Sequence, residues 1–174
     1  IQENKGKAVA RNRAAELAKG DILLITDADM IPEESFIQAH IDAHQKQKEP
    51  ACFEGLAWDL PSLNWPPNPD RLTAQVGVFP RHMKKLGWYY FLTGNISIEK
   101  SLFDQQGGFN EIFMNYGWED LELGYRLAKQ KIPLYYLKTS INYHYHVVSK
   151  DDQIKRNIKK GKATKTYPPY LIDG

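Results

Sequence analysis

The stretch Gly20-Asp21-Ile22-Leu23-Leu24-Ile25-Thr26-Asp27-Ala28-Asp29-Met30 decides the fold. Its apolar run, residues 22–25, is short and unbroken, which is typical of a strand buried on both faces in a parallel sheet. Two carboxylates, Asp27 and Asp29, follow one residue apart. Ligands of open α/β sheets bind beyond the carboxyl ends of strands, and carboxylate oxygens suit Mg²⁺ or Mn²⁺. Taken alone, the pair favours solvated turn acids; together with the motifs around it, it indicates a metal site for a phosphate-bearing substrate.

The composition is that of one ordinary globular domain. The chain has 174 residues, of which 42% are hydrophobic and 25% charged, and its net charge of +2 gives no reason to expect nucleic acid as a partner. Cys52 is the single cysteine, which excludes a disulfide framework and a cysteine-based zinc site. No apolar stretch is long enough to cross a bilayer, so we expect a cytoplasmic location, with membrane association left to segments outside this chain.

Helical patterns precede and follow the acidic stretch. Residues 6–19 are rich in alanine and end at Gly20, and they carry Arg11 and Asn12 in their middle. Asparagine is unfavourable inside a helix unless its side chain has a partner, so this pair either faces a ligand or lies on the surface. After the stretch, Pro32 and two acids predict the start of a second helix. Its His40 and His44 lie on the apolar face, which favours buried structural histidines over a metal site.

The rest of the chain alternates between strands and helices. Pro61 to Asp70, with four prolines and Trp65, predicts an irregular loop whose aromatic side chain stacks on a sugar ring or packs in the core. Gly94-Asn95 lies where the backbone could approach a ligand closely. The expected strands are 51–58, 91–98, 132–137 and 141–145, and the expected helices are 100–106 and one that begins at Trp118.

Two further groups of polar residues are candidates for chemistry. Glu119 and Asp120 fall in the first turn of the helix from Trp118, where the helix dipole favours carboxylates, but one of them could equally be a general base. Glu122 and Arg126 are expected to form a helix-surface pair. His144 and His146 alternate along a strand and would point to one face, where one of them could complete a metal site with the acidic pair.

These motifs together resemble family-2 glycosyltransferases of the GT-A fold. The resemblance rests on Ala10-Arg11-Asn12, on residues 27–32 (DADMIP) and on residues 117–127 (GWEDLELGYRL), in that order, and it extends from about residue 4 to residue 146. It is strongest to the branch with chondroitin polymerases and the galactosyltransferase C-terminal segment. The implied fold is α/β, a mixed sheet flanked by helices, with the GT-A domain at 1–149 and a helix and tail at 150–174. That family's fold begins with a nucleotide-binding βαβ unit, and this fold would be N-terminally truncated: we expect either an excerpt of a longer protein or a chain that lacks half of the nucleotide pocket.

The resemblance also implies roles for individual residues. Asp120 resembles the base that deprotonates the acceptor hydroxyl, and Glu119 the other acid of the catalytic pair. By position, it places the metal at Asp29, Asp27 and His144, with His146 in reserve; the donor at Arg11, Asn12, Asp27, Asp29, Gly94 and Asn95; and the acceptor at Trp118 and Glu119.

The leading hypothesis is therefore an inverting, metal-dependent glycosyltransferase. It would use Mn²⁺ or Mg²⁺ and transfer a sugar from a nucleotide-sugar donor, a UDP-sugar by preference, to the hydroxyl of a saccharide acceptor in polysaccharide biosynthesis. One alternative is a non-catalytic carbohydrate-binding or scaffolding remnant, since half of the nucleotide pocket would be missing. A nucleotidyltransferase ranks last, because the sequence lacks a glycine-rich basic loop for the nucleotide.

Overall fold

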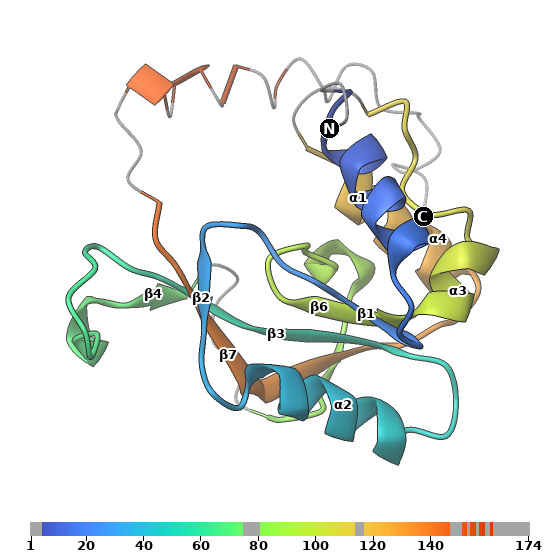
Figure 1. Ribbon diagram of the computed structural model, residues 1–174, viewed down its shortest axis with the longest axis horizontal. Coiled ribbons are helices and arrows are strands. Elements are labelled where there is room, and N and C mark those ends of the chain that lie inside the picture. Colours follow the sequence, from blue (N-terminus) through green and yellow to red (C-terminus); the bar gives the residue numbers. More distant parts are fainter. Residues whose placement is uncertain are drawn as a thin grey trace.

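A mixed sheet with helices on both faces forms the protein (Figure 1). The computed structural model describes residues 5–74, 81–113, 117–146, 151, 152, 154, 155, 157, 158 and 161. Helix α2 (Phe36–Lys46) lies on one face of the sheet, and α1 (Lys7–Leu17), α3 (Lys100–Gln105) and α4 (Glu119–Lys129) gather on the other. The residues described between 151 and 158 are helical, as expected for the C-terminal segment, and most of 159–174 lies outside the described part.

The central strands follow the order β1-β6-β3-β7-β2. Among the described strands, β3 and β7 are the parallel pair, and β1 pairs antiparallel with β6. The expectation of a parallel, doubly buried strand at 22–25 was therefore wrong, because in β1 only Leu23 is fully buried. A four-residue apolar run carries no signal for the direction of the neighbouring strand or for whether both faces of the strand are covered. The bounds are β1 Ile22–Ile25, β2 Met30–Pro32, β3 Cys52–Asp59, β4 Thr73–Ala74, β5 Lys85–Leu86, β6 Ile96–Glu99 and β7 Leu134–His144.

Strand β7 corrects a second expectation. The two strands predicted at 132–137 and 141–145 are one strand, β7, of 11 residues. Its pairing with β3 shifts between Gly55 and Leu56, whose partners are Leu137 and Ile141. The polar residues 138–140 interrupt the apolar pattern at this irregularity, which is why the sequence indicated a break. The strand expected at 91–98 is also shorter, because β6 begins only at Ile96.

The second helix begins later than the sequence pattern predicted. Pro32 does not open a helix: it ends β2, at the edge of the described sheet, where a residue without an N–H is tolerated. Helix α2 begins after Ser35. The expected Glu122–Arg126 pair is present at 2.8 Å, but Arg126 also donates to carbonyls of the turn after α3, so this pair ties two helices together.

Buried polar side chains fill the space between α2 and the sheet. His40 contacts Ser97 Oγ at 2.7 Å through Nδ1 and Asn95 Oδ1 at 2.8 Å through Nε2. His44 Nε2 lies 2.9 Å from the same Ser97 oxygen. Burial lowers the pKa of both histidines to about 4, so both are neutral at neutral pH. The prediction that they are buried structural histidines is confirmed.

The Asn95 side chain lies beside Gly55, at the irregularity in the β3–β7 pairing. Its amide donates to the carbonyls of Leu56 and Ser140, each at 3.2 Å. A Cβ on Gly55 would lie 2.3 Å from this side chain, so only glycine leaves room for it. Asn95 thus satisfies backbone carbonyls at the β3–β7 irregularity and links α2 to the loop before β6.

Candidate active site

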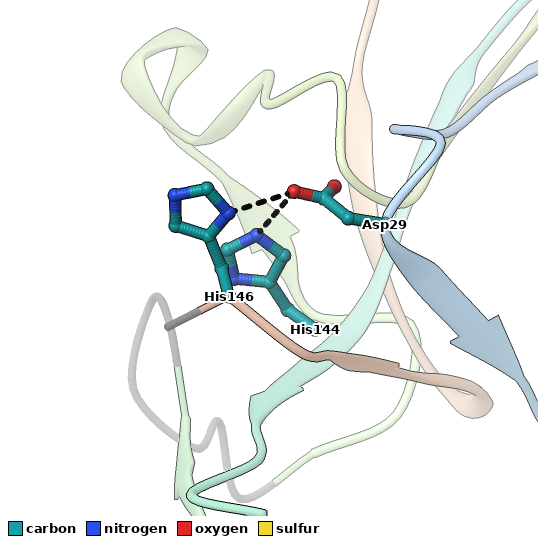
Figure 2. Close-up of side chains that lie close together, drawn as sticks. All are labelled: Asp29, His144 and His146. Atoms are coloured by element: carbon teal, nitrogen blue, oxygen red, sulfur yellow. Dashed lines mark hydrogen bonds and ion pairs between the residues drawn. The ribbon is translucent and has the colours of Figure 1, made fainter. Parts of the chain in front are cut away.

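Three possible metal ligands converge where β2 and β7 meet. Asp29 Oδ2 lies 3.1 Å from His146 Nδ1 and 3.4 Å from His144 Nε2 (Figure 2). One ligand atom from each of these residues falls within 4.8 Å of the others. The two imidazole rings are stacked, with centroids 5.3 Å apart. The sequence placed both histidines on one face, and their stacking confirms it.

The sheet itself brings these residues together. Met30 of β2 pairs with His144, the last residue of β7, and the Tyr145 amide donates to the Asp29 carbonyl at 3.2 Å. Burial opposes the ionisation of Asp29, but its backbone amide and the adjacent His144 and His146 outweigh that effect and lower its pKa. Asp29 is therefore an anion at neutral pH, ready to bind a cation.

Asp27 points to a different partner. Its Oδ1 accepts a hydrogen bond from Arg11 Nη2 at 2.9 Å, and Arg11 Nη1 donates to Glu119 Oε1 at 2.7 Å. Arg11 thus bridges the end of β1 and the start of α4. The structure groups Asp29 with both histidines, and it groups Asp27 with Arg11 and Glu119.

The two acids of α4 have different surroundings. Trp118, partly buried, precedes the helix with a left-handed backbone (φ 83°). Glu119 is 3% exposed, and its Oε2 is buried without a hydrogen-bond partner among the described residues. Burial, reinforced by the negative charge of Glu119, raises the pKa of Asp120 to about 6. A carboxyl with this pKa is ionised at neutral pH and is a better proton acceptor than an ordinary aspartate.

Glu54 is a buried acid that the sequence analysis missed. It lies on β3, is 2% exposed and accepts a hydrogen bond from the Leu92 amide at 3.2 Å. Burial raises its pKa well above the ordinary value, and the charge of Asp120 raises it further. The available signal was a single glutamate inside the apolar run 51–58, where a charged residue needs a reason.

Other candidate residues are held by the fold. The Asn12 amide group exchanges hydrogen bonds with the backbone N–H and C=O of Phe109, each at 2.8 Å, which supplies the partner that an asparagine inside a helix needs. Asn95 is fully buried in the network described above. The Gly94 carbonyl accepts from Thr26 Oγ1 at 3.0 Å and from Asn142 Nδ2 at 2.8 Å. The roles predicted for these residues near a donor stay predictions.

An open groove borders Arg11. It has a volume of about 360 Å³ and runs between α1 and β1, past Thr26. Most of its lining is apolar. Its lining residues are Arg11, Ala14, Ala15, Ala18, Ile22, Leu23, Leu24, Ile25, Thr26, Phe103 and Phe109.

Comparison with known proteins identifies the family. The model of glycosyl transferase family 2 matches residues 1–109, well over half of the chain. The chain belongs to glycosyl transferase family 2. A second model, described as the N-terminal domain of galactosyltransferase, matches residues 76–150. The resemblance inferred from the sequence motifs is therefore confirmed.

Curated relatives are longer than this chain. It is 24% identical to the uncharacterized glycosyltransferase YfnE of Bacillus subtilis in an alignment of 209 positions, which covers 91% of this chain and 53% of that protein. It is also 24% identical to the chondroitin synthase of Pasteurella multocida over 195 residues, which cover 92% of this chain and 20% of the synthase. The chain thus spans about half of one relative and a fifth of the other.

A solved structure shares the fold. The crystal structure of GalNAc-T7 with UDP, GalNAc and Mn²⁺ superposes with a TM-score of 0.64 over 86% of this chain and 32% of that one, at 16% sequence identity. At this identity the likeness concerns the fold, which is the expected GT-A fold. No helix among the described residues is long and apolar enough to span a membrane.

Proposed function

We propose that this chain carries the metal and acceptor half of a glycosyltransferase that moves a sugar from a nucleotide-sugar to a saccharide hydroxyl. The observation that carries the proposal is the convergence of Asp29, His144 and His146, with ligand atoms within 4.8 Å of one another. Family membership supports a transferase. The UDP and Mn²⁺ in the GalNAc-T7 structure make a UDP-sugar and Mn²⁺ the first donor and metal to test.

The three side chains fit a divalent transition metal. Two imidazole nitrogens and one carboxylate oxygen are acceptable to Mn²⁺, whereas Mg²⁺ prefers oxygen ligands throughout. We therefore favour Mn²⁺ over Mg²⁺, with Asp29, His144 and His146 as ligands and Asp27 as a residue of the donor site. When bound, the cation would neutralise charge on the departing diphosphate.

Asp120 is the proposed general base. Its pKa of about 6 leaves it ionised at neutral pH, so it can take the proton of the acceptor hydroxyl while that oxygen bonds to the anomeric carbon. Attack from the side opposite the diphosphate inverts the configuration at this carbon. Glu119 Oε2, which has no hydrogen-bond partner among the described residues, would accept a hydrogen bond from a second hydroxyl of the acceptor, and Trp118 would flank the sugar.

Arg11 is the proposed link between the donor and acceptor sides. Its guanidinium contacts both Asp27 and Glu119, so it holds the two carboxylates in place and offsets their negative charge. Asp27 would approach the ribose. The backbone of Gly94 and the residues at Arg11 and Asn12 would border the donor, although the side chains of Asn12 and Asn95 already have partners in the fold.

A carbohydrate-binding role without catalysis is the second candidate. One observation favours it: Trp65 is 60% exposed and makes a T-shaped contact with the ring of Tyr143, so an exposed aromatic surface is available for stacking on a sugar. Such binding would need no metal and no nucleotide.

Calorimetric titration of UDP into the chain, with and without Mn²⁺, distinguishes the metal-dependent glycosyltransferase from the carbohydrate-binding protein. We expect binding that requires Mn²⁺ and is lost in Asp29→Ala but retained in Asp104→Asn, a control on the exposed surface of α3. Equal UDP affinity in Asp29→Ala would overturn the metal site. Glycan binding by a chain that binds neither Mn²⁺ nor UDP would favour the second candidate instead.

A further inference from the structure

We propose that Asp59 is a positioning residue that sets the tautomer and ring orientation of His144. The inference rests on the proposed function, because it concerns a ligand of the proposed metal. Asp59 ends β3 and drew no attention in the sequence, where it is one acid at the start of a proline-rich loop.

The two nitrogens of His144 face two different carboxylates. Nδ1 lies 2.9 Å from Asp59 Oδ1, and Nε2 lies 3.4 Å from Asp29 Oδ2. The first distance is that of a good hydrogen bond, and the second exceeds the usual range for one. An ionised carboxylate only accepts, so the proton of a neutral His144 belongs on Nδ1, where it is donated to Asp59.

This proton location leaves Nε2 unprotonated on the side of Asp29. A neutral imidazole binds a metal through its unprotonated nitrogen, and a hydrogen bond from the other nitrogen to a carboxylate raises its basicity. Asp59 itself is not one of the three residues whose ligand atoms converge. It acts on the site through His144.

The sheet register makes this contact a built feature. Asp59 and His144 are partners in the parallel β3–β7 pair, and the Leu60 amide donates to the His144 carbonyl at 2.9 Å. On the other side of His144, Met30 of β2 is its partner. Three adjacent strand ends therefore place one carboxylate on each side of the imidazole.

Metal-free nitrogen NMR gives the first test. Long-range ¹⁵N–¹H spectra at pH 8, assigned with His144→Gln, should show His144 protonated at Nδ1 in the native sequence. They should show a shift toward the Nε2–H form in Asp59→Ala. Asp59→Asn keeps an oxygen that accepts from Nδ1, so it should largely retain the native tautomer. A native chain with His144 protonated at Nε2 would overturn the inference, whatever the metal does.

Mn²⁺ titration gives the second test. The loss expected for removal of such an outer carboxylate is about 10- to 100-fold in affinity, so Asp59→Ala should bind Mn²⁺ that much more weakly, with Asp59→Asn between it and the native chain. Asp104→Asn should bind as the native chain does. Unchanged affinity in Asp59→Ala would overturn the inference. A native chain that binds no Mn²⁺ would overturn the proposed metal site. The NMR measurement of the His144 tautomer would still test whether Asp59 orients that ring.

Discussion

Replacing Asp120 by asparagine should stabilise the protein while it greatly slows sugar transfer. The pKa of Asp120 is about 6 in the folded chain, against an ordinary value of 3.8. An acid with a raised folded pKa favours folding only while it is protonated, so its contribution is complete below pH 3.8 and is lost as the pH rises through 6. Asparagine stays neutral and avoids this loss.

The size of the effect follows from the two pKa values. At about 1.4 kcal/mol for each tenfold change in the ionisation equilibrium, the gain is about 3 kcal/mol above pH 7. The same linkage gives about 1.5 kcal/mol at pH 5 and about 0.5 kcal/mol at pH 4. Asp120 is partly buried rather than fully enclosed, so the gain in stability above pH 7 is an upper limit.

Urea unfolding of the native chain and of Asp120→Asn, from pH 4 to pH 8.5, measures this difference. The control Asp104→Asn, whose side chain is 55% exposed and paired with Lys100, should change stability by less than about 0.5 kcal/mol. Sugar transfer should fall by about 10²- to 10⁴-fold in Asp120→Asn. A gain that does not grow with pH, or a loss of stability at pH 8, would refute the reasoning.

Two further predictions concern stability, both measured by urea unfolding at pH 7.5. Arg11→Met should cost about 3 kcal/mol, because it leaves the buried carboxylate of Glu119 uncompensated; adding Glu119→Gln should recover more than half of this, and a double variant no more stable than the single one would contradict it. Gly55→Ala should cost at least about 2 kcal/mol, because its Cβ would meet Asn95 at 2.3 Å. Gly20→Ala, with its nearest contact at 3.7 Å, is the matched control, and equal losses in both would exclude the steric cause.

Periodicity predicted most elements but not how they pair. The helices α1 and α3 and the strands β1 and β3 follow from local patterns of apolar and polar residues. Pairing direction depends on contacts between distant segments, so the antiparallel edge at β1 was not visible. Within β7 the Ser140 carbonyl accepts a hydrogen bond from the distant Asn95, a contact that the local pattern of residues 138–140 likewise does not indicate.

The sequence named most residues of the candidate site, but it did not predict which of them contact one another. The spacing of Asp27 and Asp29 gives no reason to expect different partners for the two acids. In the structure, Asp27 pairs with Arg11, and Asp29 lies beside the two histidines. His146 was only the reserve ligand, because the family resemblance placed the metal at His144, and alternation alone does not say which histidine is nearer to Asp29. Glu54 and Asp59 have no local motif, and only the packing of β3 reveals them.

The separation of the ligands along the chain has a consequence for the order of folding. Asp29 and His146 are 117 residues apart, and their contact depends on β7 entering the sheet between β3 and β2. Closing so long a loop costs entropy that only later contacts return, so the ligand cluster belongs to the slowest part of assembly. A cation that requires all three side chains would not bind an early folding intermediate. Its binding would follow the formation of the native state and would not accelerate folding.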